Sequence, residues 1–240
     1  MICIGFLARL LEGVRSLTAI VLAAGKGERL GLNTPKQFIK INGKEMVKIA
    51  VERMFKLNPR IIILTTPKDY VERTRKLFEG VNSIKIIEGG KTRAESVLKA
   101  LELVNEDDEV VLIHDGARPF FPVDKTLRCV RAAEEIGAAT LAVPVKDTIA
   151  ISSDNKIASF PDRSKLWALQ TPQCFKAALI KKAHELLKKD NFLPTDDTSL
   201  ILRYNLSEVK IVEGEHYNIK VTYPVDLAFA SVIMEELVNE

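Results

Sequence analysis

Short runs of β-branched and other apolar residues alternate with longer segments of helical periodicity from Ser16 to the end of the chain. This alternation constrains the fold most strongly, because successive strand–helix units build a mainly parallel sheet with helices on both faces. The sequence therefore predicts a single α/β, Rossmann-like domain over residues 17–240. The expected strands are 18–23, 60–66, 83–88, 109–115, 139–145, 166–171 and 208–214. The expected helices lie near 45–57, 67–79, 92–104, 123–137, 175–189, 196–204 and 224–238.

Residues 146–165 interrupt this alternation. Two short alternating runs, TIAIS and KIASF, flank an Asp-Asn turn, which is typical of an antiparallel β-hairpin. Because a lone hairpin has no core of its own, we expect a protruding β-arm that packs on a second subunit and forms a homodimer. The alternative is a solvent-exposed hairpin without a partner.

Charge and cysteine content argue against several classes of protein. Lys and Arg outnumber Asp and Glu by only 35 to 32 and are scattered, which argues against a nucleic-acid partner. No apolar run approaches the roughly 18 residues that a membrane-spanning helix needs. Cys3, Cys129 and Cys174 show no disulfide-like spacing, so we expect a cytoplasmic protein. Residues 1–16 form an extension of unknown role, which fits either a surface helix or a start assigned too far upstream.

A glycine-rich loop, AAGKGERLGLNTPK, follows the first expected strand directly. In parallel sheets such loops lie at the carboxyl edge, where these folds bind ligands. The loop is not a dinucleotide fingerprint, because Leu30 stands where the third glycine is required, and it lacks the Gly-Lys-Ser/Thr of a Walker loop. Gly25 and Gly27 allow close backbone approach, while Lys26, Arg29 and Lys36 add the positive charge that suits a triphosphate. The alternative is a solvated turn with surface lysines.

Three further segments follow other expected strands. HDGARP brings Asp115, which could hold a divalent metal or a ribose hydroxyl, and Arg118, which could hold a phosphate. EGGKTRAES opens a helix after Gly89 and Gly90, and NIKVTYP leads Lys220 into the last helix. Each segment alone has an ordinary alternative: a structural salt bridge, a simple turn or a solvent-exposed lysine. Their coincidence at one sheet edge predicts a site for an anionic ligand.

The sequence offers no arrangement suited to acid–base or covalent catalysis. His114, His184 and His216 are far apart, and we expect His114 to be a core residue because it alternates away from Asp115. No serine lies in a GxSxG elbow. A phosphate monoester has a second pKa of about 6, so it is a competent nucleophile at neutral pH without a base. The sequence therefore favours attack of one phosphate on another, assisted by cations.

Seven stretches together resemble one known family, the 2-C-methyl-D-erythritol 4-phosphate cytidylyltransferases, in order and spacing over roughly residues 17–238. The stretches are AAGKGERLGLNTPKQF, GGKTRAESV, HDGARPF, PVKDTI, LWALQTPQCF, TDDTS and NIKVTYPVDL. The resemblance implies transfer of a cytidylyl group from CTP to 2-C-methyl-D-erythritol 4-phosphate, with release of pyrophosphate, in non-mevalonate isoprenoid biosynthesis. Cytidylyltransferases acting on ribitol 5-phosphate or another polyol phosphate share most of these stretches and are the main alternative. A hexose-1-phosphate nucleotidyltransferase and a non-catalytic nucleotide-binding module are the others.

Taken with the motifs, the resemblance assigns roles to individual residues, with Mg²⁺ or another divalent cation as cofactor. Catalysis is assigned to Arg29, Lys36, Arg163 and Lys220. CTP binding is assigned to Ala23, Ala24, Gly25, Lys26, Gly27, Arg29, Lys36, Gly89, Gly90, Ser96, Asp115 and Gly116. Binding of the acceptor polyol and its phosphate is assigned to Asp115, Arg118, Thr148, Arg163, Thr171, Thr195 and Lys220. Asp115 is also the candidate metal ligand.

The arm and two departures from the family pattern complete the expectations. The resemblance implies that the arm, with Thr148 and Arg163, reaches across a homodimer into the partner's site. Gly116 stands where the family usually has alanine, and TDDTS replaces a more usual TDxAS. These departures leave the reaction class unchanged and bear only on fine specificity.

Overall fold

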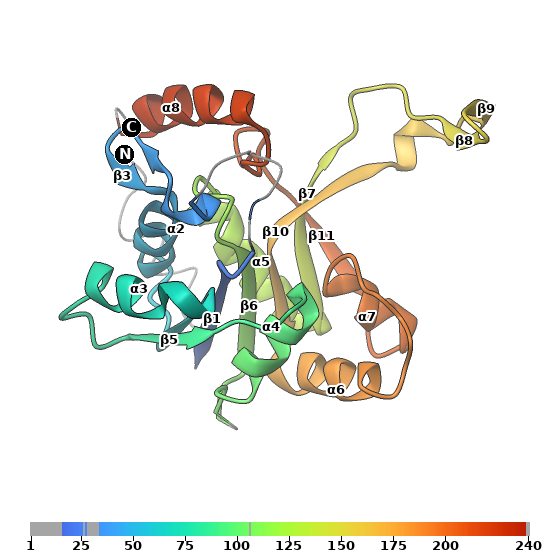
Figure 1. The fold of residues 1–240 in the computed structure, drawn as a ribbon. Coiled ribbons are helices and arrows are strands. Elements are labelled where there is room, and N and C mark those ends of the chain that lie inside the picture. Colours follow the sequence, from blue (N-terminus) through green and yellow to red (C-terminus); the bar gives the residue numbers. More distant parts are fainter. Residues whose placement is uncertain (1–15, 26, 28–33, 106, 239–240) are drawn as a thin grey trace.

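The computed structural model describes residues 16–25, 27, 34–105 and 107–238. Its centre is a seven-stranded sheet in the order β11-β7-β10-β6-β1-β4-β5 (Figure 1). Neighbouring strands are parallel except where β10 lies between β6 and β7 and runs antiparallel to both. The strands are β1 (Leu17–Leu22), β4 (Ile61–Thr66), β5 (Ile84–Glu88), β6 (Val110–Asp115), β7 (Ala138–Pro144), β10 (Trp167–Lys176) and β11 (Val209–Glu213).

Helices cover both faces of this sheet, as predicted. Side chains alternate along β1, so Ala19 and Val21 pack into one core with α2, α3 and α5, while Ile20 packs into a second core with α4, α6 and α7. The helices are α2 (Met46–Phe55), α3 (Val71–Leu77), α4 (Arg93–Leu101), α5 (Val123–Ile136), α6 (Ala177–Leu187), α7 (Thr198–Arg203) and α8 (Pro224–Val238). The described residues also form the 3-10 turns η2 (Lys36–Phe38), η3 (Lys68–Tyr70) and η4 (Arg163–Lys165). Within the described residues, no helix combines the length and apolarity needed to cross a membrane.

The predicted boundaries hold to within a few residues for most elements, but two regions differ. The strand expected at 166–171 continues to Lys176, where the sequence had predicted the start of a helix. Pro172 is typical of a strand end, but here it lies at an irregularity in the pairing of β10 with β7, a position where a strand tolerates proline. A short hairpin of β2 (Lys40–Ile41) and β3 (Lys44–Glu45) was not predicted. Its strands are too short to show a hydrophobic periodicity in the sequence. Helix α8 packs against this hairpin and against Met46 and Phe120.

The predicted arm extends away from the body of the molecule (Figure 1). It carries the antiparallel strands β8 (Ile151–Ser153) and β9 (Lys156–Ser159), joined by a two-residue turn. Asp154 and Asn155 both have positive φ angles, of 50° and 59°, which matches the mirror-image turns that join tight hairpins. Residues 146–160 are all exposed, so the described chain gives the arm no apolar layer of its own. The predictions for residues 1–15 lie outside the described residues.

Candidate active site

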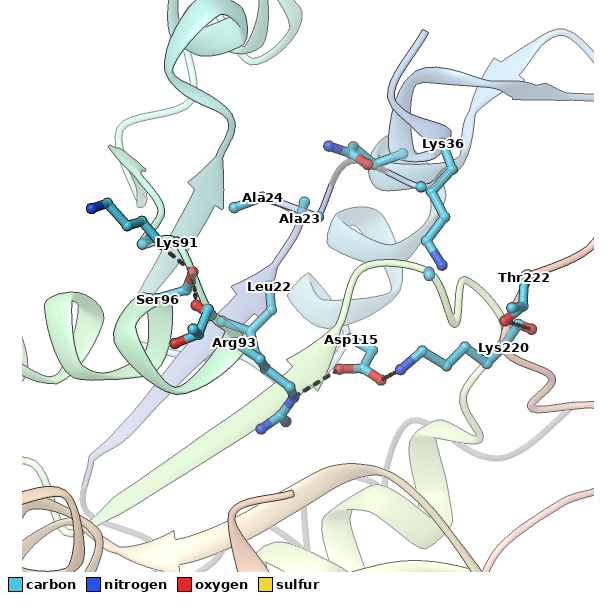
Figure 2. Close-up of a pocket in the computed structure, with 16 residues that line it drawn as sticks. Leu22, Ala23, Ala24, Lys36, Lys91, Arg93, Ser96, Asp115, Lys220 and Thr222 are labelled. Atoms are coloured by element: carbon cyan, nitrogen blue, oxygen red, sulfur yellow. Dashed lines mark hydrogen bonds and ion pairs between the residues drawn. The ribbon is translucent and has the colours of Figure 1, made fainter. Parts of the chain in front are cut away.

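A cavity of about 560 Å³ opens at the carboxyl ends of β1 and β6 (Figure 2). Three segments form its walls: the loop after β1 with the η2 turn, the turn from β5 into α4, and the segment that precedes α8. This is the sheet edge at which α/β folds bind ligands. The described lining residues are Leu22, Ala23, Ala24, Gly25, Gly27, Lys36, Gln37, Gly90, Lys91, Thr92, Arg93, Ser96, Asp115, Ala117, Lys220 and Thr222.

The loop after β1 brings its backbone close to the η2 turn. Gly27 has a φ of 72°, and a Cβ placed there would lie 2.9 Å from the Cβ of Lys36. A side chain at position 27 would therefore be strained and would push Lys36 away. The Lys36 ammonium donates a hydrogen bond to the carbonyl of Val221 at 2.9 Å, so the loop is tied to the segment that precedes α8. Figure 2 shows the Lys36 side chain entering the cavity.

The turn from β5 into α4 packs against the same loop and presents a helix start to the cavity. A Cβ on Gly89 would lie only 2.2 Å from the Cβ of Ala24, so glycine is required for this close approach. Thr92 caps α4 by accepting a hydrogen bond from the backbone N–H of Glu95 at 3.1 Å. Ser96 accepts from the N–H of Gly90 at 2.9 Å. The amino end of a helix favours negative charge, so this wall suits phosphate oxygens or a polar nucleoside edge.

Asp115 lies between two cations at the end of β6 (Figure 2). The Lys220 ammonium is 2.7 Å from its Oδ2, and Nε of Arg93 is 3.4 Å from its Oδ1. Burial alone would raise the pKa of this carboxyl, but the positive charges of Arg93 and Lys220 outweigh burial and hold the pKa well below its usual range. Asp115 is therefore ionised at neutral pH, and its negative charge partly balances the positive charges of Arg93 and Lys220.

The cavity is cationic overall. Its described lining residues include four basic side chains and a single carboxylate, that of Asp115. The basic side chains are those of Lys36, Lys91, Arg93 and Lys220. Such an excess of positive charge favours a ligand with several negative charges, such as a nucleoside triphosphate.

The cavity brings together many of the predicted site residues and leaves others at a distance. The predicted residues that line it are Ala23, Ala24, Gly25, Gly27, Lys36, Gly90, Ser96, Asp115 and Lys220. Gly89 and Gly116 lie just behind the lining, and a Cβ on Gly116 would be 3.1 Å from the carbonyl of Leu22, so alanine would need a small shift there. Lys26 and Arg29 lie outside the described residues.

The predicted acceptor residues are more scattered. Arg118 donates to the carbonyl of Asn218 at 2.8 Å, and the Thr171 hydroxyl accepts from the N–H of Asp115 at 3.0 Å. Both side chains therefore support the walls from behind the lining. Thr195 is exposed, and Thr148 and Arg163 lie on the arm, whose exposed residues do not contribute to the lining of this cavity.

Several described lining residues were not predicted from the sequence, above all Arg93. Its guanidinium contacts Asp115 and also Asp197, at 2.6 Å. Arg93 lies within GGKTRAES, and a basic residue at a helix start shortly after two glycines is a sequence pattern that could have indicated a site residue. Its pairing with Asp197 crosses 104 residues and has no local signature. Gln37, Lys91, Thr92 and Thr222 were also not predicted.

His114 is a buried core residue, as predicted. Its ring nitrogens contact the carbonyl of Arg118 at 2.9 Å and the hydroxyl of Thr171 at 3.0 Å. Burial lowers the pKa of the imidazole to about 4, so the ring is neutral at physiological pH. His114 therefore serves as a hydrogen-bonding brace between β6 and β10.

Comparisons with known proteins identify a family whose profile covers almost the whole chain. The profile of the family described as 2-C-methyl-D-erythritol 4-phosphate cytidylyltransferase matches residues 17–236. A relative of that name from Bacillus velezensis is 42% identical over 90% of this chain and 94% of its own. One from Geobacillus kaustophilus is 40% identical over 92% of this chain and 98% of its own.

Solved structures show the same architecture. The crystal structure of 4-diphosphocytidyl-2C-methyl-D-erythritol synthase from Anaerococcus prevotii superposes with a TM-score of 0.84 at 29% identity, covering 95% of this chain and 99% of that one. The 2-C-methyl-D-erythritol 4-phosphate cytidylyltransferase from Thermus thermophilus gives 0.75 at 28% identity, covering 92% and 99%. These matches confirm the predicted fold class and the resemblance drawn from the seven stretches. The chain belongs to the 2-C-methyl-D-erythritol 4-phosphate cytidylyltransferase family.

Proposed function

We propose that the protein transfers the cytidylyl group of CTP to the phosphate of 2-C-methyl-D-erythritol 4-phosphate and releases pyrophosphate. Membership of the family carries this proposal. The cavity supports it, because its basic side chains and the start of α4 suit a triphosphate and a second phosphorylated substrate. The product, 4-diphosphocytidyl-2-C-methyl-D-erythritol, is an intermediate of non-mevalonate isoprenoid biosynthesis.

The reaction forms one phosphorus–oxygen bond and breaks another. An oxygen of the acceptor phosphate attacks the α-phosphorus of CTP, and the bond from that phosphorus to the bridging oxygen of the β-phosphate breaks. The electron pair leaves with pyrophosphate, and no proton has to be removed from the nucleophile. The protein must instead align two anions and reduce their repulsion, which is a task for positioned cations.

Lys36 and Lys220 suit different parts of this task. Lys36 comes from the η2 turn and its ammonium is held at the carbonyl of Val221, and we assign it to stabilising charge at the α-phosphate. Lys220 comes from the segment before α8 and contacts Asp115 at the end of β6, and we assign it to the acceptor phosphate. Arg29, which the resemblance pairs with Lys36, keeps that role as a proposal.

A divalent cation fits the donors of this cavity. Within the described residues, no three His, Cys, Asp or Glu side chains form a ready metal site, and Asp115 is the single carboxylate of the lining. Mg²⁺ in nucleotide sites is commonly held by one or two carboxylates together with phosphate oxygens, so Asp115 would be its protein ligand. The bound ion would neutralise phosphate charge and stabilise the departing pyrophosphate.

The arm is proposed to complete the site of a second copy. Arg163 donates to the carbonyl of Lys146 at 3.2 Å, which braces the base of the arm. The exposed aliphatic side chains of Ile151 and Ile157 offer an apolar surface for a partner. Cys129 and Cys174 are buried free thiols, which suits the reducing cytoplasm in which we propose that this dimer works.

Two inactive variants are expected to restore each other's activity if the arm acts in the partner's site. A Lys36→Ala chain and an Arg163→Ala chain, co-expressed, form a heterodimer in which one site has an intact Lys36 and receives an intact Arg163. Random pairing makes half of the dimers mixed, and each mixed dimer has one intact site and one site that lacks both residues. About a quarter of the wild-type specific activity should therefore return. Pyrophosphate release by the purified mixture, compared with each variant alone, measures this. Activity no higher than the average of the two variants would place Arg163 in its own subunit's site.

The acceptor itself is tested by a substrate panel. With CTP and Mg²⁺, the protein should release pyrophosphate with 2-C-methyl-D-erythritol 4-phosphate at a higher kcat/KM than with ribitol 5-phosphate or a hexose 1-phosphate. Faster turnover of ribitol 5-phosphate would replace the proposed acceptor by the alternative one. Preference for ATP or UTP over CTP would contradict cytidylyl transfer altogether.

A further inference from the structure

Charges of alternating sign, those of Lys220, Asp115, Arg93 and Asp197, run from the cavity into the core. Lys220 contacts Asp115 at 2.7 Å, Asp115 contacts Arg93 at 3.4 Å, and Arg93 contacts Asp197 at 2.6 Å. Asp197 in turn lies 3.1 Å from Nε2 of His184. The five residues come from the segment before α8, from β6, from α4, from the start of α7 and from α6. The order of charges means that each carboxylate is shared between two neighbours.

Arg93 has its position set by carboxylates alone. Within the described part of the chain, the hydrogen-bond partners of its guanidinium are Asp115 and Asp197, and its Nη2 atom is buried without a partner. The contact with Asp197 is the shorter of the two, at 2.6 Å against 3.4 Å. Asp197 is thus the main constraint on where the guanidinium lies.

Asp197 is itself firmly held, although it does not line the cavity. Its side chain is 2% exposed, its backbone N–H donates to Oε1 of Gln173 at 3.2 Å, and its second carboxylate oxygen faces His184. Burial would raise the pKa of this carboxyl, but Arg93 and His184 reverse the effect, so the pKa is lowered and the group is ionised. A buried, ionised group with fixed neighbours is a suitable anchor for a flexible one.

We propose that Asp197 is a positioning residue that acts through Arg93 to place the Asp115 carboxylate and, with it, the Lys220 ammonium. The inference rests on the proposed function, in which Lys220 holds the acceptor phosphate. Asp197 touches no substrate in this proposal. Its effect reaches Lys220 through three successive ion pairs, Asp197–Arg93, Arg93–Asp115 and Asp115–Lys220.

Loss of the charge at position 197 would redistribute these pairs. Arg93 would keep a single carboxylate, and the 3.4 Å contact leaves room for the guanidinium to close on Asp115. A fork-shaped guanidinium binds a carboxylate better than an ammonium does, so Asp115 would turn from Lys220 toward Arg93. The ammonium of Lys220, on its flexible stem, would then spread over more positions, and the acceptor phosphate would meet a less ordered partner.

An isosteric substitution tests the proposal. Asp197→Asn should lower kcat/KM for 2-C-methyl-D-erythritol 4-phosphate about 10-fold and lower kcat/KM for CTP by a smaller factor, because Lys220 is assigned to the acceptor alone. Asp197→Glu, which restores the charge, should recover part of the loss. Asp190→Asn is the matched control, because Asp190 forms an ion pair with Arg203 in the same α6–α7 region but does not contact Arg93. It should leave both substrate constants unchanged.

A double-mutant cycle separates positioning from general damage. On an Arg93→Met background, Asp197→Asn should change the acceptor kcat/KM by less than about 2-fold, because its route to Lys220 is already broken. If Asp197→Asn fails to fold, Arg93→Lys takes its place, since one ammonium cannot bridge two carboxylates as the guanidinium does, and it should show the same selective loss.

Two results would overturn the proposal. One is an equal loss of kcat/KM for both substrates, and the other is a loss of about 10-fold that persists without Arg93. These results differ from failure of the proposed function, which would show as a wild-type protein that does not use 2-C-methyl-D-erythritol 4-phosphate. A wild-type enzyme that works normally while Asp197→Asn has no selective effect would remove the positioning role alone.

Discussion

Replacing Lys36 with alanine should lower kcat by on the order of 10²- to 10³-fold, the usual cost of removing one transition-state donor. The ammonium enters the cavity from the η2 turn and is held by the carbonyl of Val221 at 2.9 Å. In its proposed role the ammonium is therefore prepositioned, so little reorganisation would be needed as charge builds at the α-phosphate. Steady-state release of pyrophosphate at saturating CTP and acceptor measures the change.

Lys40→Ala is the control for this experiment. Lys40 lies a short way further along the chain on β2, is exposed, and makes a long ion pair with Glu45 at 3.9 Å. Its removal deletes the same charge from the protein without reaching the cavity, and kcat should stay within about 2-fold of the wild type. A Lys36→Ala protein with near-normal turnover would show that Lys36 has no part in catalysis.

Lys220→Met should weaken use of the acceptor by about 10- to 100-fold in kcat/KM and affect CTP binding far less, because a charge-assisted contact to phosphate has this range of strength. The methionine keeps most of the length of the side chain. Asp115 would retain Arg93 as a partner, so the buried carboxylate would not be left without a countercharge. Initial rates over a grid of CTP and acceptor concentrations separate the two effects.

Lys210→Met provides the matched control for Lys220. Lys210 is an exposed lysine on β11, away from the cavity lining. Its replacement should leave both substrate constants unchanged. Equal losses for CTP and for the acceptor in Lys220→Met would contradict the assignment of Lys220 to the acceptor phosphate.

The parallel part of the fold could be predicted because its inner strands β1, β4 and β6 are buried between two helical layers. Residues such as Ile20 and Val21 must then both be apolar, and such buried runs separated by helical periods are easy to recognise. Strand β10 could not be delimited in the same way. Pro172 and the polar Gln173 interrupt it, and the Gln173 side chain is satisfied by tertiary contacts with Thr140, Asp196 and the backbone N–H of Asp197.

The site could be predicted in outline for a topological reason. Loops that follow parallel strands meet at one edge, so residues as distant as Lys36, Ser96 and Asp115 could be grouped from the order of strands and loops alone. The contacts between side chains could not be grouped in this way. Arg93 reaches both Asp115 and Asp197, and such a choice depends on helix placement to within about one side-chain length. The partners of Arg93 therefore cannot be predicted from a single sequence.

The reversed direction of β10 determines where the arm can begin. The chain leaves β7 at Pro144, builds the arm, and returns in β10 at Trp167, which lies opposite Pro144 in the sheet. The arm is therefore the extended tip of one long hairpin, with both of its stems rooted at the edge that carries the cavity. A returning strand in the parallel direction would have had to start from the opposite edge. The antiparallel strand thus allows an insertion whose length can change without altering the register of the sheet.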